Sequence, residues 1–343
     1  MVICKLPSNA KNTHVNAVSL IIRRCEPPPN IIDLVDLRVR RRLRRFHLRR
    51  GVDLDASPSS RRPDFVGTVD DDDHDNKDAV VDFTVCVPPM FDKGISAQQF
   101  VEFVEVNRMF GAGRFVFYIE SIDDDLEYCI TRYADNGLVE LVPWHFDNAL
   151  DLKYHGQIIA INDCLYRTMY RTRYVVGHDA DEFIVPTSTD TWPEMLARIH
   201  SADNSTANRT ASYSFRNLFF PLQTADDDAF PQRRDLRTLA KTTTDVQVFP
   251  HEVRSKTMAR PERILLWHVH LILDSSLVWT GDVNCRVDAD DGMLFHYREI
   301  NVTLASKPNR RMHHLAEKII AGVDAGMELC RKSAFHVLKK WFS

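Results

Sequence analysis

Two aspartates, Asp179 and Asp181, stand two residues apart at the point where an apolar run ends. The residues before them, Tyr174–Val176, predict a buried strand, so both carboxylates fall at its C-terminal end, where open α/β sheets bind ligands. In an extended Asp-x-Asp both side chains leave the backbone on one side and can bind one divalent cation together with diphosphate oxygens. The same spacing is common in solvated turns, so the surrounding sequence decides between a nucleotide-sugar site and a turn.

Strand-like and helical patterns alternate along the chain that leads to this pair. Apolar runs predict strands, apolar residues at helical spacing predict helices, and Gly111 and Asn136-Gly137 are typical helix ends. The predicted strands are Val80–Val87, Arg114–Ile119 and Leu138–Val142, and the predicted helices are Ala97–Phe110, Asp124–Ala134 and His155–Tyr170. Strands that alternate with helices of about ten residues or more imply right-handed crossovers and a mostly parallel sheet covered on both faces.

After Pro186 the pattern becomes less regular. The predicted elements are a helix near Trp192–His200, β-like runs at Tyr213–Phe220, Ile264–Leu273 and Leu294–Tyr297, and one or two basic helices over Met312–Trp341. On the helix before the aspartates, the predicted buried stripe consists of Ile158, Ile161, Leu165 and Met169. Gln157 and Asp163 lie off that stripe.

A series of short motifs resembles glycosyltransferase family 92, in that family's order and approximate spacing. The motifs are Cys86–Phe91, Glu105–Ala112, Phe117-Tyr118, Val142–Trp144, Tyr154–Gln157, Asn162–Leu165 and Asp179–Pro186, then Arg254–Lys256, Arg260–Glu262, His270 and His296–Arg298. The resemblance covers residues 82–300. It implies a GT-A-type α/β fold, in which a Rossmann-like, mostly parallel sheet flanked by helices holds the donor and a less regular C-terminal half holds the acceptor.

The resemblance also implies an activity, the metal-dependent transfer of a hexose to a glycan acceptor with inversion. Galactose from UDP-galactose is the expected donor, and fucosylated N-glycans are among the acceptors of the family. Mn²⁺ is the expected cation, since carboxylate and water ligands suit it. It would offset the negative charge that appears on the departing nucleoside diphosphate.

The resemblance and the side-chain chemistry together select the candidate site residues. Asp179 and Asp181 are the candidate metal ligands. A transferase of this fold usually adds a ligand from its C-terminal half, often a His, for which His296 is the first choice and His270 the second.

Four further residues are candidates for the donor. Lys256 and Arg298 are expected to neutralise the diphosphate, Arg through a bidentate contact and Lys as a point charge. Gln157 and Asp163 are candidates for contacts to uridine or to sugar hydroxyls, although structural hydrogen bonds between helix and strand explain them equally well.

An inverting transfer needs a general base for the acceptor hydroxyl, and the sequence does not single one out. Glu182 adjoins the aspartate pair but alternates to the opposite face of an extended chain, so we expect it to tie down the loop. The acids of the C-terminal half form a better pool, comprising Asp282, Asp288, Asp290 and Asp291.

Composition and charge divide the 343 residues into three expected parts. A net charge of −4 and a pI near 6.4 argue against general nucleic-acid binding. Residues 1–78 read as a basic arm, with eight arginines between Arg38 and Arg50, followed by an acidic linker, and are expected to be disordered. Residues 79–311 are the expected glycosyltransferase domain, and 312–343 a helical segment packed on it or following it.

Cysteine usage and targeting signals are less informative. The seven scattered cysteines form no Cys-x-x-Cys pair, which leaves room for one or two disulfides but indicates no zinc site. Sequons at Asn204, Asn208 and Asn301 suit a luminal glycoprotein. Members of the family are anchored in the Golgi by an N-terminal membrane helix, and the apolar run Ala17–Ile22 is too short to be one. We therefore expect a Golgi lumen or membrane protein whose anchor is missing or of another kind.

Two other classes of protein stay open. A phosphohydrolase of the haloacid dehalogenase type also carries Asp-x-Asp after a strand, but usually after its first strand and followed by Thr or Val. Here the pair follows the fourth predicted strand and precedes Glu182. A non-catalytic carbohydrate-binding or interaction protein with the same fold is the second alternative, against which the intact pair of aspartates counts.

Overall fold

The computed structural model describes residues 80–92, 94–145, 153–202, 209–245, 247–275, 283–300 and 306–331, together with two short N-terminal strands. The chain divides into two compact units, Met1–Asp73 and His74–Ser343. In the first unit, β1 (Ala17–Val18) pairs antiparallel with β2 (Ile32–Asp33). The predicted basic arm at Arg38–Arg50, the acidic linker and all three sequons lie outside the described residues.

The first half of the second unit is the predicted alternation of strands and helices. Its elements are β3 (Val81–Met90), α2 (Ala97–Phe110), β4 (Ala112–Ile119), α3 (Asp124–Asp135), β5 (Val139–Pro143), α4 (Gln157–Thr168) and β6 (Thr172–Gly177). The four strands are parallel and lie in the order β6-β3-β4-β5. This order confirms the predicted Rossmann-like sheet, since it places the fourth strand beside the first.

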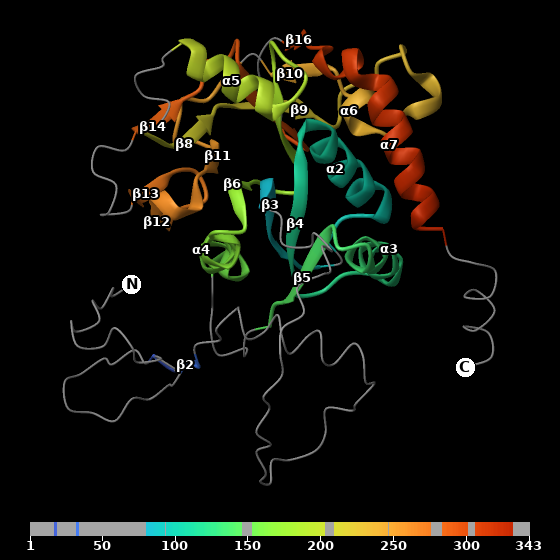
Figure 1. The fold of residues 1–343 in the computed structure, drawn as a ribbon. Coiled ribbons are helices and arrows are strands. Elements are labelled where there is room, and N and C mark those ends of the chain that lie inside the picture. Colours follow the sequence, from blue (N-terminus) through green and yellow to red (C-terminus); the bar gives the residue numbers. More distant parts are fainter. Residues whose placement is uncertain are drawn as a thin grey trace, which may run out of the picture. The chain divides into compact units, whose positions relative to one another are not determined.

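Helices cover both faces of this sheet (Figure 1). In the view shown, α2 and α3 lie on one side of the strands and α4 lies on the other. The helices fall on opposite sides because the crossovers are right-handed: the chain moves in one direction along the sheet from β3 to β5 and then returns through α4 to β6 on the other side of β3. Two hydrophobic clusters fill the two layers, and the one that includes Ala160, Cys164 and Leu165 of α4 is separate from the larger cluster around α2.

Local signals set the ends of the helices. Ser96 caps α2 and forms a capping box with Gln99, and Gly111, with φ of 124°, ends the helix in a conformation that favours glycine. The Asp123 carboxylate caps α3 by accepting the N–H groups of Asp125 and Leu126.

Three strands from the second half extend the same sheet beyond β6. They are β11 (Lys256–Ala259), β8 (Thr210–Phe215) and β14 (Val283–Arg286), and β11 is antiparallel to both β6 and β8. Parallel pairings remain the majority, so the predicted mostly parallel sheet is confirmed. The register pairs Thr257 with Gly177, which brings Lys256 beside the end of β6.

A second sheet, of three strands, begins directly after the aspartate pair. It consists of β7 (Glu182–Pro186), β15 (Gly292–Arg298) and β9 (Asn217–Pro221), with β15 in the centre. The register pairs His296 with Glu182 on one side and with Phe219 on the other. The predicted run Tyr213–Phe220 is therefore two strands of two different sheets, broken at Arg216.

The other elements lie around these two sheets or connect their strands. They are η1 (Lys153–Gly156), α5 (Trp192–Ala202), η2 (Pro231–Arg233), α6 (Arg237–Ala240), β10 (Thr243–Asp245), η3 (Pro261–Arg263), β12 (Ile264–Trp267), β13 (Ile272–Ser275), β16 (Ser306–Pro308), η4 (Arg311–Leu315) and α7 (Ala316–Leu329). The predicted strand Ile264–Leu273 is the antiparallel pair β12 and β13. The predicted C-terminal helix corresponds to η4 and α7, and its part beyond residue 331 lies outside the described residues.

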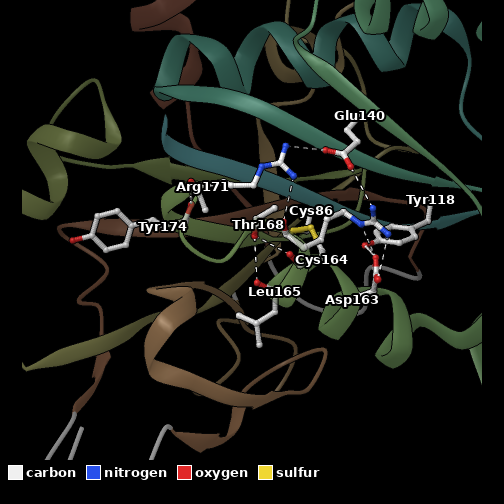
Figure 2. The surroundings of a disulfide bond; sticks show 11 residues. Cys86, Tyr118, Glu140, Asp163, Cys164, Leu165, Thr168, Arg171 and Tyr174 are labelled. Carbon is white, nitrogen blue, oxygen red and sulfur yellow. Dashed lines mark hydrogen bonds and ion pairs between the residues drawn. A yellow bond between two sulfur atoms is a disulfide. The ribbon is translucent and has the colours of Figure 1, made fainter. Parts of the chain in front are cut away.

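Two disulfides join these elements. Cys86 of β3 is bonded to Cys164 of α4, and Cys129 of α3 to Cys330 at the end of α7. Figure 2 shows the first bridge at the contact between strand and helix. Because Cys164 has to face β3, the buried face of α4 is Ala160, Cys164, Leu165 and Thr168. The predicted stripe is wrong at Ile158, which is 43% exposed.

Candidate active site

A cleft of about 790 Å³ opens at the C-terminal ends of β3 and β6. Its wall on one side is the end of β3 with the following Phe91 and the start of α4, and its floor is the loop Asp179–Glu182. Arg254, His268–His270 and two residues of β15, His296 and Arg298, form the other side. The cleft thus lies at the edge of the parallel sheet where α/β folds bind ligands.

Asp179 is held by two side chains at the floor of this cleft. Its Oδ2 accepts a hydrogen bond from Lys256 Nζ at 2.9 Å, and its Oδ1 accepts one from Gln157 Nε2 at 3.1 Å. Lys256 Nζ also lies 3.1 Å from Glu182 Oε2, and its side chain is only 3% exposed. Burial works against the ammonium form, but the two carboxylates outweigh it and raise the pKa of Lys256. Lys256 is therefore a buried cation shared by two acids.

Asp181 faces His296, which comes from the other sheet. His296 Nε2 lies 3.2 Å from Asp181 Oδ2, and its Nδ1 lies 3.1 Å from Glu182 Oε1. Burial raises the pKa of the Asp181 carboxyl, but the hydrogen bond and charge of His296 outweigh it and the net shift is downward. Burial by itself would lower the pKa of His296, but the nearby carboxylates of Glu182 and Asp181 outweigh it, so the net shift of the His296 pKa is upward. The carboxylate of Asp181 stays 35% exposed toward the cleft.

The loop that carries the pair is a turn, which differs from the extended geometry expected from the sequence. The Glu182 N–H donates to the Asp179 carbonyl at 3.1 Å, and the Asp179 N–H donates to Glu182 Oε2 at 3.1 Å. The turn brings Glu182 onto the same side as the aspartates, so the expected opposite face is wrong. Glu182 does tie down the loop, and burial raises its pKa to about 7.

Asp181 and His296 are the side chains of the cleft lining that could hold a divalent cation. The Glu182 carboxylate faces Nδ1 of His296 and orients the ring, so that Nε2 lies beside the partly exposed Asp181 oxygen; metal-binding histidines are commonly oriented by a carboxylate in this way. In the part of the chain that the structure describes, no group of three His, Cys, Asp or Glu side chains gathers as a complete metal site. Two protein ligands suit a cation whose other positions are filled by phosphate oxygens and water.

Of the four predicted donor residues, the structure places Gln157 and Arg298 in the lining of the cleft, but not Lys256 or Asp163. Gln157, Arg298 and the second-choice ligand His270 all line the cleft. Asp163 Oδ2 instead accepts hydrogen bonds from Tyr118 Oη at 2.6 Å and Arg167 Nε at 2.8 Å, beside the Cys86–Cys164 bridge (Figure 2). Asp163 therefore makes structural hydrogen bonds between helix and strand, the second explanation that the sequence offered for it.

The described members of the predicted pool of general bases do not line the cleft. Asp288, Asp290 and Asp291 lie in the turn between β14 and β15, and Asp291 binds Arg198 at 2.6 Å. Asp282 lies outside the described residues. The acids among the described residues of the cleft lining are Asp179, Asp181 and Glu182.

Sequence reasoning missed three residues of the cleft wall. Arg254 and His268 line it, and both fall within or beside motifs that carry the family resemblance. Tyr154 is 67% exposed at the cleft, and its φ of 51° places it in the left-handed region. The sequence signal that could have found it was its place in the Tyr154–Gln157 motif.

The sequence model of glycosyltransferase family 92 matches residues 81–328. The chain therefore belongs to this family and is a glycosyltransferase. It is also similar to the beta-1,4-galactosyltransferase galt-1 of Caenorhabditis elegans, with 33% identity over 106 residues. That match covers 30% of this chain and only 25% of the relative.

Two solved structures show a distant likeness. S. aureus TarS 1-349 covers 74% of this chain and 68% of its own, with 9% identity and a TM-score of 0.32. The glucosyl-3-phosphoglycerate synthase of Mycobacterium tuberculosis, in complex with Mn²⁺, UDP and glucosyl-3-phosphoglycerate, covers 74% and 82%, with 13% identity and a TM-score of 0.26. Scores this low carry no detail of those sites over to this chain.

Proposed function

We propose that this glycosyltransferase transfers galactose from UDP-galactose to a glycan acceptor, with inversion and with the help of Mn²⁺. The observation that carries the proposal is the convergence of Asp181 and His296, from two different sheets, at the sheet edge where a nucleotide would bind. Membership of the family and the partial likeness to a beta-1,4-galactosyltransferase support the choice of sugar.

The described side chains divide the work of donor binding. Asp181 and His296 would hold the cation, which when bound offsets charge on the departing diphosphate. Arg298 lines the cleft and would contact the same diphosphate. Lys256, which the sequence suggested for that contact, instead keeps Asp179 and Glu182 in place. Gln157 fixes Asp179 from the side of α4.

The compartment and the acceptor belong to the same proposal. Disulfides form and persist in oxidising compartments, and the two bridges of this chain therefore suit the Golgi lumen. None of the described helices is long and apolar enough to cross a membrane. A fucosylated N-glycan is the first acceptor to test, since family 92 enzymes use such glycans.

Calorimetry with UDP and Mn²⁺ tests the site. Wild type should bind UDP more tightly with Mn²⁺ than without it, and Asp181→Asn should lose that gain. The control is Asp228→Asn, since Asp228 is an exposed aspartate that pairs with Arg234 and does not line the cleft. Equal affinity of wild type and Asp181→Asn in Mn²⁺ would refute the site. Failure of wild type to bind UDP at all would favour the non-catalytic alternative.

A further inference from the structure

The positively charged side chain of Arg254 faces the cleft and is available to a ligand. The residue is exposed and lines the cleft, and among the described residues its guanidinium makes no hydrogen bond or ion pair. It lies over two aromatic rings instead, 5.2 Å from the centre of Phe249 and 5.6 Å from that of Phe219. Stacking of this kind holds the planar group while leaving its N–H donors available to a ligand.

The backbone around Arg254 is held in an uncommon conformation. Glu252 and Arg254 have φ of 71° and 59°, in the left-handed region that residues other than glycine rarely adopt. Ser255 pins this loop, since its Oγ accepts the Glu252 N–H at 2.9 Å and its carbonyl lies 3.1 Å from His270 Nδ1. Conformations of this kind persist where the surrounding structure enforces them, often at ligand sites.

Ring contacts connect Arg254 to the proposed metal ligands. Phe219, on which the guanidinium lies, packs against the ring of His296 with centroids 4.9 Å apart. Arg298 follows His296 by two residues on β15, so both side chains leave the strand on the same face. Arg298 also lines the cleft and forms no side-chain hydrogen bond or ion pair within the described part of the chain. Two arginines with available donors thus flank the Asp181–His296 pair.

The acids at the floor of the cleft are already contacted by Lys256 and His296, so the two arginines remain available to bind an incoming anion. Lys256 contacts Asp179 and Glu182, and His296 contacts Asp181 and Glu182. An arginine fork matches the oxygens of a phosphate and forms stronger hydrogen bonds than a neutral donor does. We propose that Arg254, together with Arg298, binds the diphosphate of the nucleotide and does so in place of Lys256. This inference rests on the proposed function, because it assumes a nucleoside diphosphate ligand.

The test compares UDP with uridine on the full chain in the presence of Mn²⁺. Arg254→Ala should weaken UDP binding by about tenfold or more, as expected for the loss of a charge-assisted phosphate contact. It should change the affinity for uridine by no more than about twofold, because uridine carries no phosphate. Arg254→Lys should recover part of the loss, and Arg234→Ala, at an exposed arginine that pairs with Asp228, should leave both affinities unchanged.

Two results would overturn the inference. Unchanged UDP affinity in Arg254→Ala would exclude the contact, and an equal loss for UDP and uridine would indicate a general collapse of the cleft. Unchanged UDP affinity with a raised KM for the glycan would assign Arg254 to the acceptor. If one of these results is obtained while wild type binds UDP normally, the inference fails but the proposed function does not. If wild type does not bind UDP, the proposed function fails with it.

Discussion

Lys256 is the residue on which the floor of the cleft depends. Its side chain is buried, and its ammonium compensates the carboxylates of Asp179 and Glu182 from β11. A buried charge that loses its partner is far more costly than a surface pair, since water cannot replace the partner. The same residue read from the sequence alone looked like a phosphate ligand, because neither its burial nor its neighbours are visible there.

Replacing Lys256 should destabilise the protein strongly. Lys256→Met keeps the length of the side chain but leaves two acids without their cation, and we expect a loss of about 3 to 5 kcal/mol in the free energy of unfolding. Urea unfolding at pH 7 measures this. The matched control is Lys318→Met, since Lys318 is 63% exposed and lies 3.9 Å from Asp190, and it should cost less than about 1 kcal/mol. Equal losses in both variants would contradict the role of Lys256.

Asp227 should make the stability depend on pH in the acid range. Burial raises the pKa of its carboxyl, but hydrogen bonds from the Ala229 N–H, Arg310 and Thr242 outweigh burial and lower it to about 2. An acid with a lowered folded pKa contributes stability above its unfolded value and loses it as the pH falls through the folded value.

The contribution of Asp227 is thus present at pH 6 and disappears between about pH 4 and pH 2. At pH 6 we expect Asp227→Asn to lower the free energy of unfolding by about 1 to 2 kcal/mol. The gap to wild type should close as the pH falls, which urea unfolding at several pH values measures. A gap that stays constant down to pH 2 would show that ionisation of Asp227 does not matter.

At the scale of elements, α7 completes the domain by packing against α2 and α3. Cys330 at its end is bonded to Cys129, and Gly326 lies where the helix approaches its neighbours most closely. A Cβ at Gly326 would collide with Tyr133 Oη and come within 2.6 Å of Val101 Cγ1. At Gly322, one turn earlier, the nearest atom to such a Cβ is Glu105 Cβ at an ordinary 3.4 Å.

The two glycines should therefore respond in opposite directions to the same substitution. Gly326→Ala should cost about 1 to 3 kcal/mol through overpacking, despite the better helix propensity of alanine. Gly322→Ala should be neutral or stabilise by up to about 1 kcal/mol, because the propensity gain meets no clash. Thermal or urea unfolding of the two variants compares them directly. Stabilisation by both would mean that α7 does not pack closely at Gly326.

The sequence predicted individual elements best where a local signal marks their ends. α2 was predicted with its observed bounds, because its apolar residues recur at helical spacing and Gly111 stops it. The break between β8 and β9 was not predicted although the polar pair Arg216 and Asn217 stands there, because what divides the run is its pairing with two different sheets. The buried stripe of α4 was misjudged because the bond to Cys86, invisible in periodicity, fixes which face meets the sheet.

At the scale of the whole molecule, the sequence predicted the place of the site but not the contacts between its side chains. The position of the aspartates after a strand fixed the sheet edge, and the family motifs pointed to His296. The partnership of Lys256 with Asp179 depends on the antiparallel register of β11 against β6, which joins segments about 80 residues apart and has no local signature. Arg254 was missed for a similar reason, since one of its two aromatic supports, Phe219, comes from the separate strand β9.

The division of the chain at Asp73 and His74 predicts that the second unit folds by itself. A protein that consists of residues 74–343 should have the same free energy of unfolding and the same affinity for UDP in Mn²⁺ as the full chain. Urea unfolding and calorimetry measure both quantities side by side. A protein that fails to fold, or that loses nucleotide binding, would show that the transferase domain needs residues of the first unit.

The most direct test of the whole account is transfer from UDP-galactose to a fucosylated N-glycan in Mn²⁺, with wild type beside Asp181→Asn. Wild type should give a β-linked product by NMR, and the variant should be slower by about a hundredfold or more, because the cation contributes several kcal/mol to the transition state. An α-linked product, equal rates for the two proteins, or turnover of simple phosphate esters without any sugar donor would contradict the account.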